Sequence, residues 1–138
     1  MTDENRRRNI ADELVRADQG LRAATALVGL GLNADAVSRA YYAVFHLLRA
    51  ALLSRGVDPK THAGAIHLFN TELVRKGTFP SAHNRLLGGL QRARELADYD
   101  AAVAFSAEDA GAEVAAAHEF SRAVLEVLTK EGWTGASS

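Results

Sequence analysis

The chain of 138 residues contains no cysteine. This absence excludes disulfide bonds, a thiolate nucleophile and a thiolate metal site. The chain also lacks an excess of charge of either sign, because its formal net charge is -1. A protein that coats nucleic acid through bulk electrostatic attraction is therefore excluded. Any site for a polyanion has to be a local one.

Long apolar runs are missing too, since none approaches the roughly 20 residues that a membrane-spanning helix needs. The first eight residues are rich in charged side chains, which does not fit a signal peptide. With 48% hydrophobic and 24% charged residues, the composition is that of one globular domain with a real core. We expect a cytoplasmic protein that does not bind a membrane.

Proline is scarce, and its two occurrences, Pro59 and Pro80, lie in short polar or glycine-bearing stretches. Between these stretches apolar residues recur every three or four positions, which is the period of one helix face. No segment alternates with a period of two for long enough to form a strand. The sequence predicts an all-α, up-and-down bundle of about five helices over residues 1–130, followed by a flexible C-terminal tail at 131–138. The predicted helices span about residues 3–29, 34–55, 62–76, 81–98 and 107–130.

The run Ser-Arg-Ala-Tyr-Tyr-Ala-Val-Phe-His at positions 38–46 is the most informative part of the chain. It sets Arg39 and His46 seven positions apart, so both side chains emerge from one helix face about 10 Å apart along the axis. A histidine moves protons, and the planar guanidinium of an arginine holds phosphate oxygens and stabilises developing negative charge. The pair suits phosphodiester chemistry, although the same spacing also occurs by chance on a solvated or dimer-facing helix.

Two more side chains fall on the stripe of Arg39 and His46. Arg49 adds positive charge, and Tyr42 could stack on a base or hydrogen-bond a phosphate, with half-buried packing as the alternative.

At the end of the fourth predicted helix, the acidic residues of the run Asp-Tyr-Asp at 98–100 could orient Arg94. The alternative for that run is a plain helix end whose tyrosine plugs the bundle.

The histidines do not form a metal-binding pattern. His62 and His67 are five positions apart, which misses the i, i+4 spacing of paired ligands on a helix, and no set of acidic ligands flanks them. We therefore expect neither a metal nor another cofactor.

Four separated motifs resemble those of the HEPN domain, the small helical domain of prokaryotic toxin-antitoxin and nucleotidyltransferase-linked systems. They occur in the order found in that family. The motifs are the run at 38–46, the loop at 54–57 with Lys-Thr-His at 60–62 after it, the block Phe-Asn-Thr-Glu-Leu-Val at 69–74, and Arg-Glu-Leu-Ala-Asp-Tyr-Asp at 94–100. The resemblance implies a HEPN-like fold and a homodimer in which two copies of the motif meet across a cleft.

Active members of that family carry an arginine, four to six intervening residues and then a histidine, and the resemblance places this pair on Arg39 and His46. It implies a metal-independent endoribonuclease site, in which the histidine assists attack of the 2'-hydroxyl on the adjacent phosphate and the arginine stabilises the transition state. His62 recurs beside Thr61 in the family, which implies a binding role near the same cleft; a capping or core-satisfying role is the alternative.

The chain also departs from the best-studied toxins of the family. They place the motif late and follow its histidine with any residue and then a tyrosine, whereas here the motif is early and Leu47 and Leu48 follow His46. Many HEPN proteins act as binding or partner modules, so the fold alone does not decide catalysis. The sequence therefore predicts a protein that binds RNA or a nucleotide, but not DNA, with a ribonuclease toxin as its sharpest form. The alternative is a non-catalytic homodimeric module that partners a nucleotidyltransferase antitoxin.

Overall fold

The computed structural model describes residues 2–99 and 105–134. Within these ranges the chain forms five α-helices and one short π-helical segment, with no strand. This confirms the predicted all-α bundle. The elements are α1 (Asp3–Gly29), α2 (Asn33–Leu53), α3 (His62–Phe69), the π-helical segment η1 (Asn70–Val74), α4 (Ser81–Tyr99) and α5 (Ala107–Lys130).

Short polar residues begin two of the helices at the predicted positions. The Thr61 hydroxyl accepts a hydrogen bond from the backbone N–H of Gly64 at 2.9 Å, and the Ser106 hydroxyl accepts one from the N–H of Asp109 at 2.9 Å. Each bond satisfies a donor that the first helical turn would otherwise leave unpaired. After α2 the chain turns at Gly56, whose φ of 76° lies in the left-handed region that favours glycine.

The sequence predicts one continuous helix at 62–76, but the structure divides this stretch into the α-helix α3 and the π-helical segment η1. The α-helix ends at Phe69, and the backbone widens into η1 before the chain leaves the helix. Phe69 and Leu73 are both buried and keep a spacing that an α-helix would also give. The apolar pattern therefore carries no information about the wider turn.

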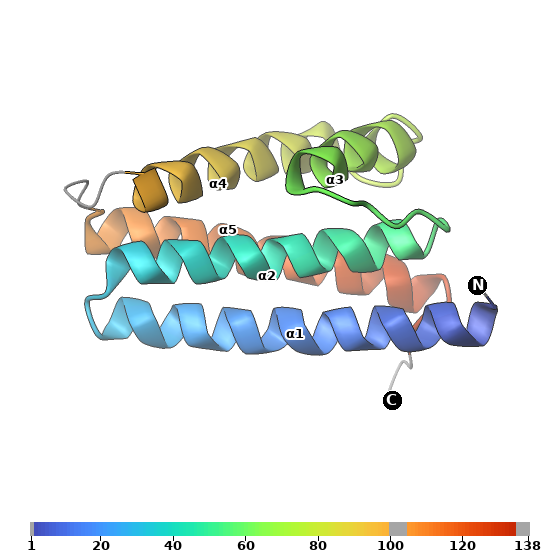
Figure 1. The fold of residues 1–138 in the computed structure, drawn as a ribbon, viewed down its shortest axis with the longest axis horizontal. Helices are drawn as coiled ribbons and strands as arrows, with labels where there is room; N and C mark the ends of the chain where they lie inside the picture. Colours follow the sequence, from blue (N-terminus) through green and yellow to red (C-terminus); the bar gives the residue numbers. More distant parts are fainter. Residues whose placement is uncertain (1, 100–104, 135–138) are drawn as a thin grey trace.

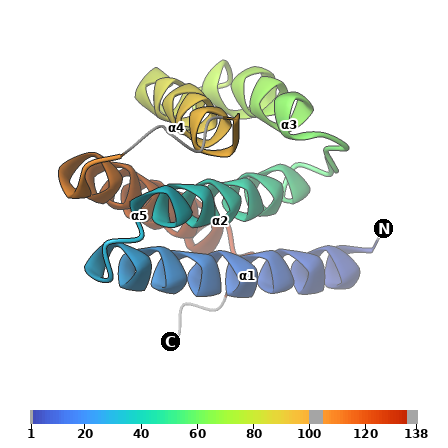
Figure 2. The same cartoon turned by 60° about the vertical axis from the view of Figure 1, so that its left-hand side comes forward.

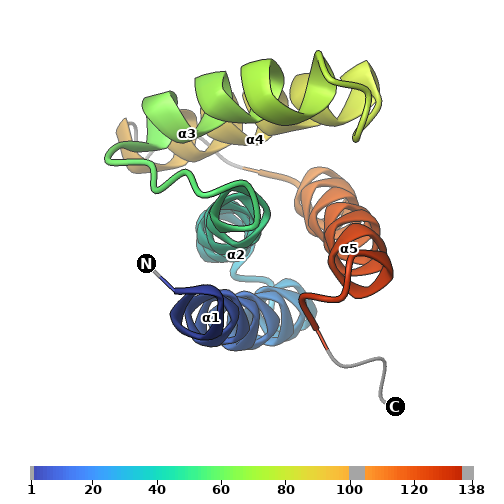
Figure 3. The same cartoon turned by 90° about the vertical axis from the view of Figure 1, so that its right-hand side faces the viewer.

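The central element of the bundle is α2, which packs against α1, α3, α4 and α5. More than half of its 21 residues are buried. The end-on view shows α1 below α2, α5 beside them, and the α3–α4 layer on the opposite side of α2 from α1 (Figure 3). The colours of the chain show that α1 and α4 run in one direction and α2 and α5 in the other (Figure 1). The oblique view shows the same arrangement, with α3 and α4 above α2 and α1 below it (Figure 2).

The helices α1 and α2 approach each other closely at Gly20. A Cβ atom on this glycine would lie 3.0 Å from the Cβ of Ala43, which is tighter than an ordinary contact between side chains. Two small residues therefore set the distance between the helices. The close approach also brings Glu13, earlier on α1, within hydrogen-bond reach of the part of α2 where the predicted site lies.

The chain after α5 is held at its beginning. Trp133 packs against the main core, and its ring faces the guanidinium groups of Arg6 and Arg7 at 5.5 and 5.4 Å. Of the predicted tail at 131–138, residues 131–134 are described, and the rest lie outside the described residues. None of the helices in the described ranges has the length and apolar character that crossing a membrane requires.

Candidate functional site

Three of the predicted site residues lie on one face of α2 and border the same surface. Arg39, Tyr42 and His46 line two open depressions of about 600 and 370 Å³ that share these three side chains. The larger depression extends along α2 to Asp35, and the smaller one is completed by α1, including Arg16. The helical spacing therefore does bring the arginine and the histidine to one surface.

His46 is anchored from α1. Its Nδ1 lies 2.6 Å from Oε2 of Glu13, a short hydrogen bond of the charge-assisted kind. The Glu13 side chain is only 9% exposed and that of His46 is 24% exposed. One ring nitrogen of His46 is thus held inside the α1–α2 interface, while the ring edge still reaches the surface depressions.

Arg49 lies between two carboxylates. Its Nη1 is 3.3 Å from Oε1 of Glu13, and its Nη2 donates to Oδ1 of Asp58 at 3.1 Å. Lys60 lies farther from the same aspartate, with 3.9 Å between its Nζ and Oδ2 of Asp58. The guanidinium that was predicted to bind RNA or a nucleotide therefore ties α1, α2 and the loop before α3 together.

His62 begins α3 and packs against the side chains of Tyr41 and Phe45 on α2. Its Nδ1 lies 2.9 Å from the Tyr41 hydroxyl, and its ring centre is 4.0 Å from that of Phe45. Burial lowers the pKa of His62, and electrostatic interaction with Arg94 and then with His46 lowers it further. Burial also raises the pKa of Tyr41. A neutral imidazole of His62 that accepts a hydrogen bond from the Tyr41 O–H is consistent with the lowered pKa of the histidine and the raised pKa of the tyrosine.

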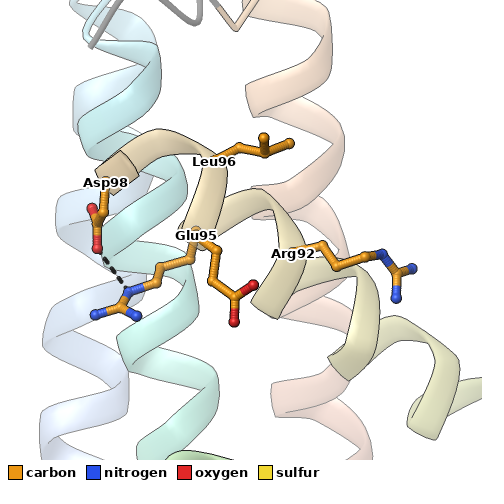
Figure 4. Close-up of a pocket in the computed structure, with 5 residues that line it drawn as sticks. Arg92, Glu95, Leu96 and Asp98 are labelled. Atoms are coloured by element: carbon orange, nitrogen blue, oxygen red, sulfur yellow. Dashed lines mark ion pairs between the residues drawn. The ribbon is translucent and has the colours of Figure 1, made fainter. Parts of the chain in front are cut away.

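Arg94 of α4 contacts the site at Tyr42. Its Nη2 donates to the Tyr42 hydroxyl at 2.9 Å, and its guanidinium carbon lies 5.4 and 5.6 Å from the ring centres of Tyr41 and Tyr42. Its Nε is 2.8 Å from Oδ2 of Asp98, which is one of the two interpretations that the sequence left open for this carboxylate (Figure 4). Ser38 donates to the other oxygen of Asp98 at 3.4 Å. The tyrosine of the site is therefore oriented from α4.

A further open depression of about 740 Å³ lies beside this ion pair on α4. Arg92, Leu96 and Asp98 line it, and the side chain of Arg92 extends away from Asp98 (Figure 4). The side chain of Tyr99, predicted as a plug of the bundle, and the whole of Asp100 lie outside the described residues.

Comparison with known proteins places this architecture in a family. The family model of the HEPN domain matches residues 11–128, which span α2, Glu13 and the α4 residues of the site. The chain belongs to the HEPN domain family. The resemblance noted in the sequence is thereby confirmed.

Three relatives of this HEPN domain illustrate its neighbourhood. A UPF0332 protein of Gloeobacter violaceus is 37% identical over 120 residues, which cover 86% of this chain and 95% of that protein. A protein of Methanocaldococcus jannaschii with the name "Putative toxin MJ0605" is 40% identical over 83 residues, or 60% of this chain and 62% of that protein. A second protein of this organism, "Putative toxin MJ0142", is 28% identical over 104 residues, covering 75% and 71%.

Glu13 of this HEPN domain was not among the site residues predicted from the sequence. A signal for it exists, because the buried stripe of α1 contains one charged residue among apolar ones. The apolar spacing alone would place Leu14 on this stripe, but Leu14 is only partly buried and Glu13 takes the inward position. A carboxylate at a core position of a helix needs a partner on the facing helix. Glu13 is the charged member of the buried stripe, whose residues are Ile10, Glu13, Ala17, Leu21 and Ala24.

The two histidines of α3 have different surroundings. His62 packs on the tyrosines of α2, whereas His67 is exposed. In the part of the chain that the structure describes, no three histidine, aspartate or glutamate side chains are grouped so that they could hold a metal ion.

Proposed function

We propose that this HEPN domain is a metal-independent endoribonuclease and the toxin of a toxin-antitoxin pair. The observation that carries the proposal is that Arg39 and His46 border the same open depressions, with Tyr42 between them. The histidine supplies proton transfer, the arginine holds phosphate oxygens, and the tyrosine offers a stacking surface for a base. The word "toxin" in the names of two relatives supports the biological side of the proposal.

The availability of Arg39 supports its role. This side chain is exposed, and within the described residues it has no hydrogen bond or ion pair with another group. The guanidinium of Arg49, by contrast, is already bound by Glu13 and Asp58. An unpaired guanidinium beside an open depression keeps its fork of N–H donors for a phosphate of the substrate.

The proposed reaction uses the nucleophile that RNA itself carries. His46 takes the proton of a 2'-hydroxyl, the O2' atom forms a bond to the adjacent phosphorus, and the bond from phosphorus to O5' breaks. The products are a 2',3'-cyclic phosphate and a 5'-hydroxyl, whose proton comes from a protonated histidine. In a homodimer, the His46 of a second copy serves as that acid. DNA lacks the 2'-hydroxyl and is not cut.

A second function is favoured by a different observation. Two of the arginines around the site, Arg49 and Arg94, are paired with carboxylates, which weakens the local attraction for RNA. The same face would then serve as the interface of a non-catalytic homodimeric module that partners a nucleotidyltransferase antitoxin.

Cleavage of cellular RNA by the purified protein in the presence of EDTA tests the proposal. Wild type is compared with Arg39→Ala, His46→Ala and the control Arg22→Ala, which removes an exposed arginine of α1 that pairs only loosely with Asp18 at 3.9 Å. The expected result is cutting that survives chelation, leaves 2',3'-cyclic phosphate ends and is lost in the first two variants alone. Folded wild type that does not cut would contradict the nuclease and favour the module.

A further inference from the structure

Glu13 is a buried carboxylate in the middle of the apolar stripe of α1. Such a group is costly to bury unless its charge is paired and its oxygens are hydrogen-bonded. Both conditions are met from α2, because one oxygen contacts His46 and the other contacts Arg49. The contact with the histidine, at 2.6 Å, is the shorter of the two by 0.7 Å.

We infer that Glu13 is a positioning residue that holds His46 as the tautomer with its proton on Nδ1, so that Nε2 is the basic nitrogen that meets the substrate. A carboxylate has no proton to give, so at 2.6 Å the Nδ1 atom is the donor. A neutral imidazole carries one proton, and the lone pair is then on Nε2. The inference rests on the proposed ribonuclease function and adds a residue to it.

Arg49 and Asp58 orient the carboxylate in turn. Nη1 of Arg49 holds Oε1 of Glu13 at 3.3 Å, while Nη2 is fixed by Asp58 at 3.1 Å. The arginine is therefore held from both ends, and the free rotation of the Glu13 carboxylate is removed. Oε2 is left facing the imidazole ring. Hydrogen-bonded partners of this kind fix the tautomer and the ring plane of a histidine.

The position of the pair suits this role better than a simple tie between helices. The Glu13 side chain is 9% exposed, which keeps water from competing for Nδ1, whereas the His46 ring borders the depressions that it shares with Arg39. A tie between helices would need neither an exposed ring edge nor a defined tautomer. The structure thus separates the two ring nitrogens, with one inside the interface and the other left for a ligand.

The tautomer is measured directly by long-range ¹H–¹⁵N NMR of the histidine side chains at about pH 8.5, where an ordinary imidazole is neutral. The signals of His46 are identified by their loss in His46→Gln. Wild type is expected to show one His46 form, protonated on Nδ1. In Glu13→Gln and Glu13→Leu, the form protonated on Nε2 should rise at least threefold. Asp12→Asn, an exposed change one position away on α1, should match wild type.

A wild-type His46 that is protonated on Nε2 would overturn the inference, and so would an unchanged ratio of tautomers in both Glu13 variants. All variants are first compared with wild type by circular dichroism. Should Glu13→Gln not fold, Glu13→Leu, which fills the same buried space without a polar group, provides the comparison.

Cleavage kinetics add a second measurement. In Glu13→Gln, kcat is expected to fall about 100-fold, since proton transfer is impaired, while KM stays within about twofold because Arg39 still binds the phosphate. Wild type that fixes the Nδ1–H tautomer but cuts no RNA would reject the ribonuclease and keep the positioning role of Glu13. Active wild type with mixed tautomers, or with kcat unchanged in Glu13→Gln, would reject the positioning role and keep the ribonuclease.

Discussion

The two histidines beside the site use the same ring nitrogen in opposite ways. Nδ1 of His46 faces a carboxylate, which can only accept a hydrogen bond, whereas Nδ1 of His62 faces the Tyr41 phenol, which can donate one. The lowered pKa of His62 and the raised pKa of Tyr41 fit an acceptor imidazole and a protonated phenol. The proposed proton transfer therefore falls to His46, whereas the contacts of His62 favour a neutral ring.

This difference predicts how stability depends on pH. Burial, followed by electrostatic interaction with Arg94 and His46, lowers the pKa of His62 in the folded protein. As the pH falls below about 6.5, the unfolded chain takes up a proton at this position before the folded protein does. The free energy of unfolding should therefore decrease between about pH 6.5 and the lowered folded-state pKa. Urea unfolding at pH 7.5 and 5.5 measures the loss.

The comparison that isolates His62 is His62→Gln, which keeps a hydrogen-bonding side chain but does not titrate. Its loss of stability over this interval should be smaller than that of wild type. His83, whose pKa is also lowered by burial, and Glu113, whose pKa is raised by burial, contribute to both proteins and cancel in the difference. Equal losses in the two proteins would contradict the prediction.

At the scale of the elements, the apolar period predicted the helices well because burial of one face is what each helix does in the bundle. It predicted α1 with the bounds that the structure shows. The starts of α3 and α5, directly after Thr61 and Ser106, were predictable because the hydroxyls of these residues act within one turn. The ion pair of Arg94 and Asp98 was predictable for the same reason, since its partners are four residues apart. The contacts of Glu13 were not, because they depend on the rotation of α1 against α2.

Arg49 joins three elements, and its removal tests the cost of leaving Glu13 with one partner fewer. Arg49→Met keeps much of the apolar stem but removes the charge near a buried carboxylate. We expect a loss of about 1–3 kcal/mol in the free energy of unfolding, below the figure for a fully buried pair because the Arg49 side chain is 30% exposed. Equilibrium unfolding in urea measures it.

The double variant Glu13→Leu/Arg49→Met should recover part of that loss, since no buried charge remains unpaired. The control Arg22→Met breaks an exposed pair with 79% and 69% of the two side chains accessible, so it should change stability by less than about 0.5 kcal/mol. If the double variant is less stable than Arg49→Met, the unpaired carboxylate is not the source of the cost.

For the whole molecule, the net charge of -1 means that the proposed binding of RNA needs a local arrangement of arginines. The smaller depression provides one, because Arg16 of α1 and Arg39 of α2 both line it together with His46. The closely packed helices α1 and α2 thus present two guanidinium groups at the depression that His46 also borders. A single strand that is held at Arg39 would continue across α1 past Arg16.

This path predicts a salt-dependent contribution from Arg16. In a His46→Ala background that leaves RNA uncut, adding Arg16→Ala should weaken binding to a similar degree for different sequences and reduce the slope of log K against log salt by about 0.7, the value for one phosphate contact on a single strand. Adding Arg22→Ala, whose arginine lies on α1 but does not line the depression, should leave the slope unchanged. Fluorescence anisotropy of a labelled RNA oligonucleotide over a salt series measures all three. Equal slopes for the Arg16 and Arg22 variants would mean that the strand does not cross α1, and binding that does not respond to salt at all would favour the protein-protein interface over the RNA site.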